Sequence, residues 1–455
     1  MTFNRRSILT AGVGAAGLAA ATAAHAGAAK PTRDAATVPA ADAVPGLEPN
    51  ADRDQTAVLQ AAIDTAAIKG VPLILPPGVI RITDVRLRAG TRLIGSSRTT
   101  VLQFASGPAF LTAEKADGLL LQDIVLDGAF IAFDEARGEG LITLANSKGI
   151  TIDGVEIRNS AKGGLSLIAC AGRVMNSTIT GVLDFGLKSL DATGLDIAGN
   201  TISNCGNNGI LVWRSEKGED GTTITNNRVA KIRNASGGTG EYGNGINVFR
   251  AGSVIVAQNR ISDCAFTAVR GNAANNIQII ANSCERLGEV AIYSEFGFEG
   301  ALIANNMIDF AATGISVTNF NEGGRLAVIQ GNLIRNLFRR EHDREDKRGE
   351  GIGVEADAVV SGNTIEGAPT VGIQIGWGPF MRDVAATGNV IRNAKVGISI
   401  TSGAETGACL IANNLISKTG DGAIRKMTLG VTSGPDLARE PASAGHMTIT
   451  GNVAV

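Results

Sequence analysis

A short peptide returns along the chain at a spacing that few folds can use. "GNTIS" at residues 199–203 recurs as "GNLIR" from 331, "GNTIE" from 362 and "GNVIR" from 388, with "NNMID" and "NNLIS" as close variants. Most steps between the second residues of these signals are 23 to 27 residues long. These residues are Asn200, Asn227, Asn259, Asn282, Asn306, Asn332, Asn363, Asn389, Asn414 and Asn452. A repeat of this length predicts one supersecondary unit stacked many times.

A second signal alternates with the first. A small residue precedes alternating apolar positions, as in "GILVW" from 209, "GINVF" from 245, "GISVT" from 314 and "GIQIG" from 372. Short segments with a period of two and many β-branched residues indicate strands, and no helical period runs through them. We therefore predict an all-β parallel β-helix over residues 52–455, with one coil per repeat and coils about 4.8 Å apart.

The repeated asparagines have a structural interpretation. Asn and Gly tolerate the left-handed backbone that a sharp corner between short strands requires. An inward-facing Asn can also hydrogen-bond to the Asn of the coils above and below. Because such a stacked amide has all its bonds made, we assign this ladder to the fold and not to catalysis.

Residues 52–70, "DRDQTAVLQAAIDTAAIKG", have the pattern of a short amphipathic helix. Asp52 or Asp54 is available as its N-cap. One helical stripe carries Val58, Leu59, Ala62, Ile63, Ala66 and Ala67. We expect this helix to cap the first coil and protect its open edge. The first strands then come from "VPLILPPGVIRITDVRLRAGTRLIGSS".

The N-terminus reads as an export signal. Arg5 and Arg6 precede an apolar stretch of small residues that closes on "AHA" at 24–26, which is typical of a twin-arginine signal cleaved after about Ala26. We predict a signal peptide at 1–26, a flexible linker at 27–51 and a soluble periplasmic protein that meets the twin-arginine translocase during export. The alternative is an uncleaved N-terminal anchor. The rest of the chain contains no run of about 18 apolar residues, so we predict no stable membrane span.

The opening of the predicted domain resembles a known superfamily. "DQTAVLQAAIDTAAIKGVPLILPPGVIRIT" followed by "LRAGTRLIGSS" is similar to the start of pectate-lyase-like, right-handed β-helix proteins. With the arginine pair and the "GN-x-I" coils, the whole chain resembles a group of bacterial twin-arginine-translocated repeat proteins. The resemblance implies a right-handed solenoid. It leaves the reaction open, because the superfamily includes lyases, hydrolases, epimerases and non-catalytic proteins.

The composition limits the classes of partner and cofactor that we expect. The formal net charge is −2 and falls further when the two signal arginines are removed, so we expect no nucleic-acid partner. The five cysteines show no CxxC pair and predict buried thiols. With only His342 and His446 beyond the signal, we expect no histidine-based metal site and no cofactor. Calcium stays open, because four acidic residues lie close together in sequence: Asp191, Glu216, Glu219 and Asp220.

Two coils are longer than their neighbours. Asn227 to Gly245 spans 18 residues and Asn332 to Gly351 spans 19, where the same segment elsewhere takes 8 to 11. Both insertions leave the same corner, four coils or about 19 Å apart. They are placed to form two walls of a cleft over the strand that follows. The second insertion includes the charged segment 338–350, which we interpret as a solvated loop.

The outward positions of that following strand gather most of the large aromatic residues. Both tryptophans and Tyr293 fall on it, and Tyr242 lies in the first insertion. Flat rings and guanidinium groups suit a sugar chain, so we predict an acidic or neutral polysaccharide or cell-envelope glycan as the ligand. The predicted binding residues are Trp213, Arg214, Asn247, Phe249, Arg250, Asn272, Glu355, Trp377 and Tyr242. The alternative is that these side chains only seal the sheet.

Two chemistries remain open on this face. In the first, Arg214, Arg250 and Arg270 neutralise a uronate while Tyr293 or Lys188 moves a proton, as in a polysaccharide lyase or C5 epimerase. In the second, Glu295 and Glu355 act as a carboxylate pair about 9.6 Å apart along the stack. The predicted catalytic residues are Arg270, Tyr293, Glu295 and Lys188. The rival hypothesis is a non-catalytic envelope protein that uses the same face.

Overall fold

The computed structural model describes residues 44–455, apart from 341–347, 402, 404 and 440–445. The predicted signal peptide, most of the predicted linker and His342 lie outside the described residues. Within the described part of the chain, no helix combines the length and apolarity needed to cross a membrane.

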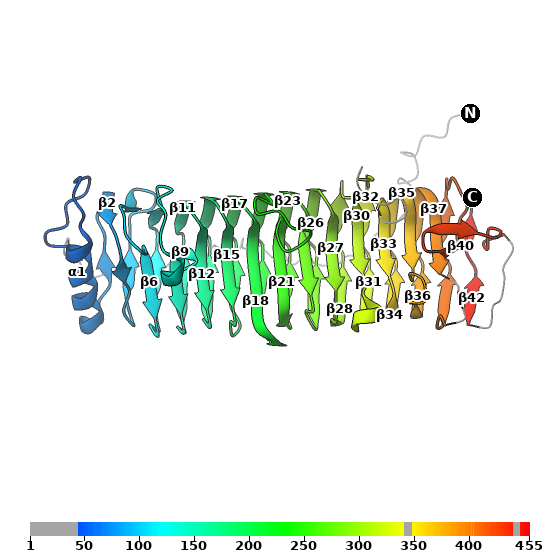
Figure 1. The fold of residues 1–455 in the computed structure, drawn as a ribbon, viewed down its shortest axis with the longest axis horizontal. Coiled ribbons are helices and arrows are strands. Elements are labelled where there is room, and N and C mark those ends of the chain that lie inside the picture. The colour runs from blue at the N-terminus through cyan, green and yellow to red at the C-terminus, as the bar shows by residue number, and fades with distance from the viewer. Residues whose placement is uncertain (1–43, 341–347, 402, 404, 440–445) are drawn as a thin grey trace, which may run out of the picture. The chain divides into compact units, whose positions relative to one another are not determined.

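The described residues form a parallel β-solenoid, which confirms the predicted fold (Figure 1). Each coil supplies strands to three columns that run along the stack. The first column is a 15-stranded parallel sheet. Its strands are β1 (Leu73–Ile74), β4 (Arg92–Ile94), β7 (Leu120–Gln122), β10 (Ile150–Asp153), β13 (Gly172–Met175), β16 (Asp196–Ala198), β19 (Thr223–Thr225), β22 (Ile255–Ala257), β25 (Ile277–Ile280), β28 (Glu299–Ala304), β31 (Arg325–Gln330), β34 (Ala356–Ser361), β36 (Arg382–Thr387), β38 (Cys409–Ala412) and β42 (Met447–Thr450).

The second column follows the "GN" corner. Its strands are β2 (Gly78–Ile82), β5 (Thr100–Phe104), β8 (Val125–Asp127), β11 (Glu156–Ser160), β14 (Thr178–Val182), β17 (Thr201–Cys205), β20 (Arg228–Ile232), β23 (Arg260–Cys264), β26 (Ser283–Leu287), β29 (Met307–Asp309), β32 (Leu333–Arg335), β35 (Thr364–Ile375), β37 (Val390–Thr401), β39 (Leu415–Ser417) and β43 (Val453–Ala454).

The third column follows the small residue of the second signal. Its strands are β3 (Val85–Arg86), β6 (Leu111–Glu114), β9 (Gly140–Ala145), β12 (Gly163–Ile168), β15 (Phe185–Leu190), β18 (Asn208–Glu219), β21 (Asn244–Gly252), β24 (Val269–Asn272), β27 (Val290–Glu295), β30 (Thr313–Val317), β33 (Glu350–Val354) and β40 (Ile424–Thr428). The long strands β35 and β37 run through both the second and third columns and join them into one sheet. A short strand, β41 (Val431–Ser433), pairs antiparallel with β40.

The asparagine ladder is present and explains the first repeated signal. In one rung, the backbone N–H and the side-chain amide of Asn282 both donate to Oδ1 of Asn306, at 2.9 and 3.0 Å. The same amide also donates to the Val256 carbonyl at 2.9 Å. The left-handed backbone belongs to the residue before the ladder position, such as Asn305 with φ 58°. The first residue of each signal therefore forms the corner, and the second residue forms the ladder.

The small residue of the second signal allows neighbouring backbones to approach each other. A Cβ atom on Gly314 would lie 2.5 Å from the Gly351 carbonyl oxygen, and one on Gly351 would lie 2.3 Å from that of Gly372. Inward side chains of the third column, such as Ile292, Ile315 and Ile352, are fully buried. All five cysteines are buried thiols, as predicted.

In the part of the chain that the structure describes, the one α-helix, α1 (Thr56–Lys69), lies at the N-terminal end of the stack (Figure 1). Leu59, Ile63 and Ala66 are buried, as the predicted stripe requires. The N-cap position is Gln55, one residue beyond the predicted Asp54, whose carboxylate instead accepts the Thr56 N–H at 2.9 Å.

The last residues of the predicted linker belong to the domain. Val44 and Leu47 are buried in the same hydrophobic core as α1. The Asn50 N–H also donates to the Val79 carbonyl at 2.7 Å. The structured domain therefore includes residue 44, eight residues before the predicted start, because these apolar side chains cover the first coil.

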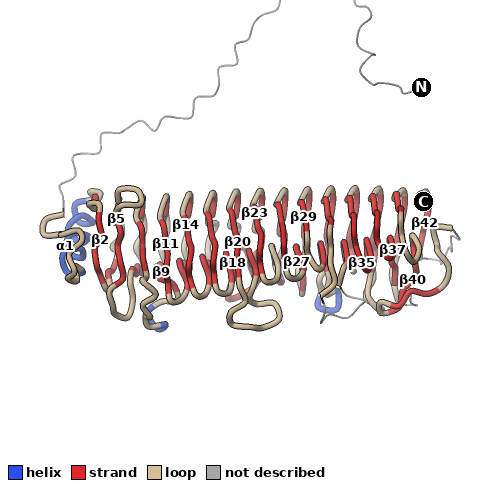
Figure 2. The backbone as a smooth tube through the Cα atoms, turned by 90° about the horizontal axis from the view of Figure 1, so that it is seen from above, coloured by secondary structure: helices blue, strands red, loops and turns tan. Residues whose placement is uncertain are grey.

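The longer loops lie on one side of the stack (Figure 2). The two predicted insertions, 233–243 and 336–349, both connect the second column to the third. Strand pairing from β21 through β24, β27 and β30 to β33 places them four coils apart, as predicted. Two short 3-10 helices, η1 (Glu135–Arg137) and η2 (Phe320–Glu322), also interrupt connecting loops.

Candidate functional site: a trough along the third column

The outward face of the third column carries the predicted site residues in register. Lys188 aligns with Leu211, Asn247, Arg270, Tyr293 and Ser316 on successive coils. Two residues further along each strand, Trp213 aligns with Phe249, Asn272 and Glu295. The alternation read from the sequence therefore gave the correct face, because every coil contributes a strand of the same period.

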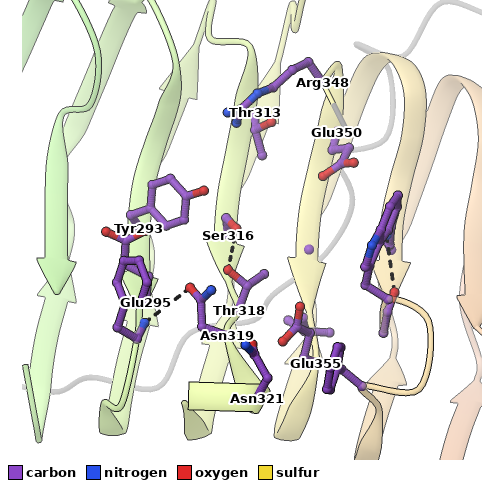
Figure 3. Close-up of a pocket in the computed structure, with 17 residues that line it drawn as sticks. Tyr293, Glu295, Thr313, Ser316, Thr318, Asn319, Asn321, Arg348, Glu350 and Glu355 are labelled. Carbon is purple, nitrogen blue, oxygen red and sulfur yellow. Dashed lines mark hydrogen bonds between the residues drawn. The ribbon is translucent and has the colours of Figure 1, made fainter. Parts of the chain in front are cut away.

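The main cavity on this face has a volume of about 390 Å³ and lies over β27, β30 and β33 (Figure 3). Its walls come from those strands, from the region of η2, from the second insertion and from the turn after β35. The lining residues are Tyr293, Glu295, Phe296, Thr313, Ser316, Thr318, Asn319, Asn321, Arg348, Glu350, Gly353, Val354, Glu355, Gln374, Gly376, Trp377 and Phe380.

A second hollow, of about 350 Å³, lies next to the main cavity over β18, β21 and β24. Phe296 lines both, so the two follow each other along the stack. The first insertion supplies one wall of the second hollow. The lining residues are Trp213, Thr239, Gly240, Glu241, Asn247, Phe249, Arg270, Asn272 and Phe296. We call the main cavity and the second hollow together the trough.

The Arg270–Glu295 ion pair joins the two parts of the trough. Nε of Arg270 donates to Oε1 of Glu295 at 2.6 Å, and the two side chains are 11% and 5% exposed. Nη1 of Arg270 also donates to the Gly240 carbonyl at 2.8 Å, which ties the first insertion to the face. Asn272 donates to the same Glu295 oxygen at 3.1 Å. Burial raises the pKa of Glu295, against the lowering effect of Arg270 and Asn272.

Tyr293 lies beside this pair and lines the main cavity (Figure 3). The Arg270 guanidinium lies 5.2 Å from the centre of its ring. Burial raises the pKa of Tyr293 to about 12. The phenol is therefore protonated at neutral pH, and it can donate a hydrogen bond to a ligand more readily than it can act as a base.

Two of the predicted acidic residues face the same cavity. Glu295 ends β27 and Glu355 follows β33, with β30 between them, so Figure 3 shows both at the same end of the cavity. Oε2 of Glu355 accepts the Phe320 N–H at 2.7 Å. Glu350, at the start of β33, lines the other end near Thr313 and Arg348. The cavity thus places three carboxylates around one ligand-sized space.

Four buried polar atoms in the trough have no hydrogen-bond partner among the described residues. They are Nε1 of Trp213, Oδ1 of Asn247, Oγ1 of Thr313 and Oε1 of Gln374. Asn247, Thr313 and Gln374 are 5%, 1% and 7% exposed. A buried polar atom without a partner costs about 1–3 kcal/mol, so a row of them on one face needs a ligand or ordered water.

The aromatic residues at the N-terminal end of the trough pack on one another and on cations. The Trp213 and Phe249 rings meet edge to face, 6.0 Å apart. Nζ of Lys188 lies 5.4 Å from the centre of the Trp213 ring, and the Arg250 guanidinium lies 4.8 Å from that of Phe249. Both rings line the second hollow.

The structure does not bring all the predicted residues together. Lys188 pairs with Glu139 at 2.6 Å and lies four coils, about 19 Å, from Tyr293. It therefore cannot act on the same bond as Tyr293. Lys188 and Tyr242 line neither part of the trough.

The three predicted arginines also do not converge. Only Arg270 lines the trough. Arg214 donates to the Ala192 carbonyl at 3.2 Å, and Arg250 donates to the Ser215 carbonyl at 2.8 Å. Arg250 lines a separate hollow beside Lys217 and Glu219. Pairing between β18 and β21 is irregular between Trp213 and Gly218, and Arg250 has a left-handed backbone with φ 58°, so the alternation breaks at these residues.

Sequence reasoning missed several lining residues. Thr313 and Glu350 each precede the small residue of their coil and pair with each other across β30 and β33. The same position holds Asn208 and Asn244 on earlier coils, which also pair. This polar column was readable from the sequence. Arg348 and Phe380 come from loops and Asn321 from η2, and no repeat marks them.

Two of the four acidic residues considered for calcium, Asp191 and Asp220, hydrogen-bond to protein groups. Asp191 accepts the Ser215 N–H and hydroxyl at 2.8 and 2.6 Å, and Asp220 accepts the Thr222 N–H at 3.1 Å. Burial raises the pKa of Asp220. The described residues contain no cluster of three or more side chains suited to a metal ion. His446, which hydrogen-bonds Thr406 at 3.2 Å, lies away from the trough.

Comparison with known families identifies the class of protein. The family model described as the right handed beta helix region matches residues 140–219 and 208–380. These matches cover more than half of the chain and include the whole trough. The protein belongs to the right-handed β-helix family. No curated protein matches the sequence.

Solved structures show the same architecture at low identity. A GH87 α-1,3-glucanase catalytic unit from Streptomyces thermodiastaticus superposes with a TM-score of 0.51 and 18% identity, over 91% of this chain and 69% of that one. PfbA, a surface adhesin of Streptococcus pneumoniae, gives 0.45 and 15%, over 86% and 94%. The A-module of the Azotobacter vinelandii mannuronan C-5 epimerase AlgE4 gives 0.41 and 16%, over 89% and 98%. These likenesses concern the fold alone.

Proposed function

We propose that the protein binds an extended polysaccharide along the trough, between Trp213 and Trp377. The observation that carries the proposal is the row of four buried, unpartnered polar atoms on this face. Sugar hydroxyl groups both donate and accept hydrogen bonds, so a polysaccharide can satisfy all four. Six coil steps separate the two tryptophans, which gives a trough about 29 Å long. The glucanase and the epimerase act on polysaccharides by their names, but the proposal rests on this face itself.

The binding test compares two glutamines on different faces. Gln374 lines the trough, whereas Gln278 faces outward from the first column. We expect Trp213→Ala with Gln374→Ala to abolish retention of the mature protein in gels containing the bound polysaccharide. Trp213→Ala with Gln278→Ala should weaken it less. Retention unchanged by the first double substitution would show that the polysaccharide binds elsewhere or not at all.

A second candidate function is hydrolysis in the main cavity. The observation that favours it is the position of Glu295 and Glu355 on either side of β30. Burial raises the pKa of Glu295, so this carboxyl group can take up a proton and act as the general acid once its ion pair with Arg270 opens. Glu355, which accepts a backbone N–H, suits the carboxylate that activates water. Elimination is less well supported, because Tyr293 is protonated and Arg270 is held by Glu295.

The products distinguish the chemistries. Hydrolysis creates reducing ends, elimination creates an unsaturated end group that absorbs ultraviolet light, and epimerisation changes neither. We expect the unchanged protein to create reducing ends. The Glu295→Gln and Glu355→Gln variants should create none but should still bind the polysaccharide. Binding without any product would favour the non-catalytic envelope protein. Each assay runs with and without calcium, which tests whether binding or activity depends on this ion.

We also propose that the protein is exported through the twin-arginine route and acts in the periplasm. The proposal rests on Arg5, Arg6 and the "AHA" at 24–26, which lie outside the described residues. Replacing both arginines by lysine should leave the protein in the cytoplasm at its full length. Export of that variant at the normal rate would refute the assignment.

A further inference from the structure

A third hollow continues the outward face of the third column beyond the trough. It has a volume of about 210 Å³ and is lined by residues of β35, β37 and the hairpin that β40 and β41 form. Gln374 lines both this hollow and the main cavity, so the two follow each other along the stack. We call this space the hairpin hollow.

Two buried polar atoms lie on the sheet side of the hairpin hollow. Strand pairing places Gln374 and Ser399 side by side on neighbouring coils, in the outward row that also holds Tyr293 and Ser316. They are 7% and 1% exposed. Among the described residues, neither Oε1 of Gln374 nor Oγ of Ser399 has a hydrogen-bond partner. Nε2 of Gln374 donates to the Gly376 carbonyl at 3.3 Å, so the hollow holds one carbonyl acceptor beside one hydroxyl that can donate.

The walls of the hairpin hollow are mostly apolar. Val371 comes from β35, Val396 from β37 and Met427 from β40. Leu429 and Val431 of the hairpin line it as well, although they are 54% and 69% exposed. Apolar surface gains free energy when a ligand removes it from water, so these walls favour an apolar group beside the two polar atoms.

An acetamido group matches this combination of polar and apolar contacts. Its N–H can donate to Oε1 of Gln374, its carbonyl oxygen can accept from the Ser399 hydroxyl, and its methyl group can pack against the apolar walls. An O-acetyl ester has no N–H for Gln374, and a sugar hydroxyl has no methyl group. A free amino group is positively charged and would meet Lys395, the one charged side chain among the described residues that line the hollow.

We infer that the hairpin hollow binds the N-acetyl group of an amino sugar, so that the ligand is a glycan containing N-acetylamino sugars. This inference rests on the proposed function, because the hollow adjoins the trough, and it narrows the ligand class. Buried groups that pair with a ligand amide discriminate strongly against an analogue without it, because the polar atoms are then left unpaired.

The first test uses oligosaccharides of one linkage and different substituents. β-1,4-linked hexamers of glucose, glucosamine and N-acetylglucosamine share the same backbone, and calorimetry measures their binding to the full mature protein. We expect the N-acetylated hexamer to bind at least tenfold more tightly than the other two. Saturation-transfer NMR with free N-acetylglucosamine and N-acetylgalactosamine needs no particular linkage, and the acetyl methyl protons should receive the strongest saturation from the protein.

Variants of two matched serines locate the effect. Ser399→Ala removes the hydroxyl and should reduce the preference for the N-acetylated hexamer at least fivefold. Ser399→Leu also fills the hollow and should abolish the preference while the glucose hexamer binds as before. Ser166 lies in the same outward row, is fully buried and has no partner among the described residues, but it lines neither the trough nor the hairpin hollow. Ser166→Ala should leave the preference unchanged, and circular dichroism checks that each variant keeps its strands.

The outcomes separate the inference from the proposal beneath it. Equal binding of the glucose and N-acetylglucosamine hexamers overturns the inference while the polysaccharide-binding proposal survives. A preference that Ser166→Ala reduces as much as Ser399→Ala does also overturns the inference. Absence of both hexamer binding and saturation transfer overturns it too, and the gel assay then decides the proposal. Retention in a polysaccharide gel that Trp213→Ala with Gln374→Ala abolishes would keep the proposal, whereas no retention in any gel would overturn both.

Discussion

The Arg270–Glu295 pair offers a sharp test of how the trough is held together. Replacing either residue leaves the other charge buried in the wall between the two parts of the trough. Arg270→Met removes the bond to Glu295 and also releases the Gly240 carbonyl of the first insertion. Glu295→Gln keeps the shape but leaves the guanidinium without its counter-charge.

The geometry sets the expected size of the effect. Two unit charges 2.6 Å apart attract by about 6 kcal/mol at an effective dielectric constant of 20, and desolvation offsets part of this. Removing one partner of a buried pair typically costs about 3–5 kcal/mol. We expect each single variant to lower the free energy of unfolding by about 3 kcal/mol. The double variant should lose about 4 kcal/mol rather than the sum, because contacting residues couple.

Urea unfolding of the four proteins of this cycle measures the coupling. A matched cycle uses Arg286 and Asp263, whose side chains form two hydrogen bonds at 2.7 and 2.9 Å on the second column. Those side chains are 47% and 39% exposed, so their coupling should be much smaller. If the loss at Arg270 and Glu295 is additive to within about 0.5 kcal/mol, the pair is not the buried link described here.

Three further predictions concern the stack. Asn306→Ala removes the acceptor of the Asn282 N–H and one of the two acceptors of the Asn282 amide, so it should cost about 2–4 kcal/mol in urea unfolding. Asn452→Ala, at the partly exposed end of the ladder, should cost less. Gly351→Ala should lower the melting temperature sharply, because its Cβ would lie 2.3 Å from a carbonyl oxygen. Gly353→Ala should lower it only slightly, because its Cβ would have an ordinary contact at 3.6 Å. Equal effects of the two substitutions would refute the argument. The Arg382 and Arg325 guanidinium groups lower the pKa of Asp357, so Asp357 stabilises the fold above its ordinary pKa and loses this effect as the pH falls through the lowered value. Asp357→Asn should therefore destabilise the protein at pH 7 and cost progressively less as the pH falls below the ordinary pKa of aspartate, and a loss that does not change with pH would contradict this account.

Much of the site was predictable because every coil repeats the same strand. The period of two placed Arg270, Tyr293 and Glu295 on one outward face, and pairing between neighbouring strands confirmed it. The loop lengths correctly gave both insertions the same corner. The prediction was less successful where the pairing of β18 and β21 becomes irregular, because Arg214 and Arg250 donate to backbone carbonyls there and do not line the trough.

Loop residues could not be placed from the repeat. Arg348 reaches Glu289 across the coil stack, and Phe380 pairs with Trp377 through a short backbone bridge after β35. These contacts depend on how each loop folds back over the sheet. No local spacing encodes that path, so the loop lengths predicted the two walls but not the residues that form them.

The sequence by itself determined the solenoid, the ladder and the facing of each strand, because these follow from local periodicity repeated coil after coil. A ladder asparagine has the same neighbours in every coil, so one coil predicts the next. Only the tertiary structure decided which charges meet. It paired Arg270 with Glu295 and Arg348 with Glu289. Charge pairing depends on distances of a few ångströms between residues far apart in the chain, and that information exists only after the coils and loops have packed.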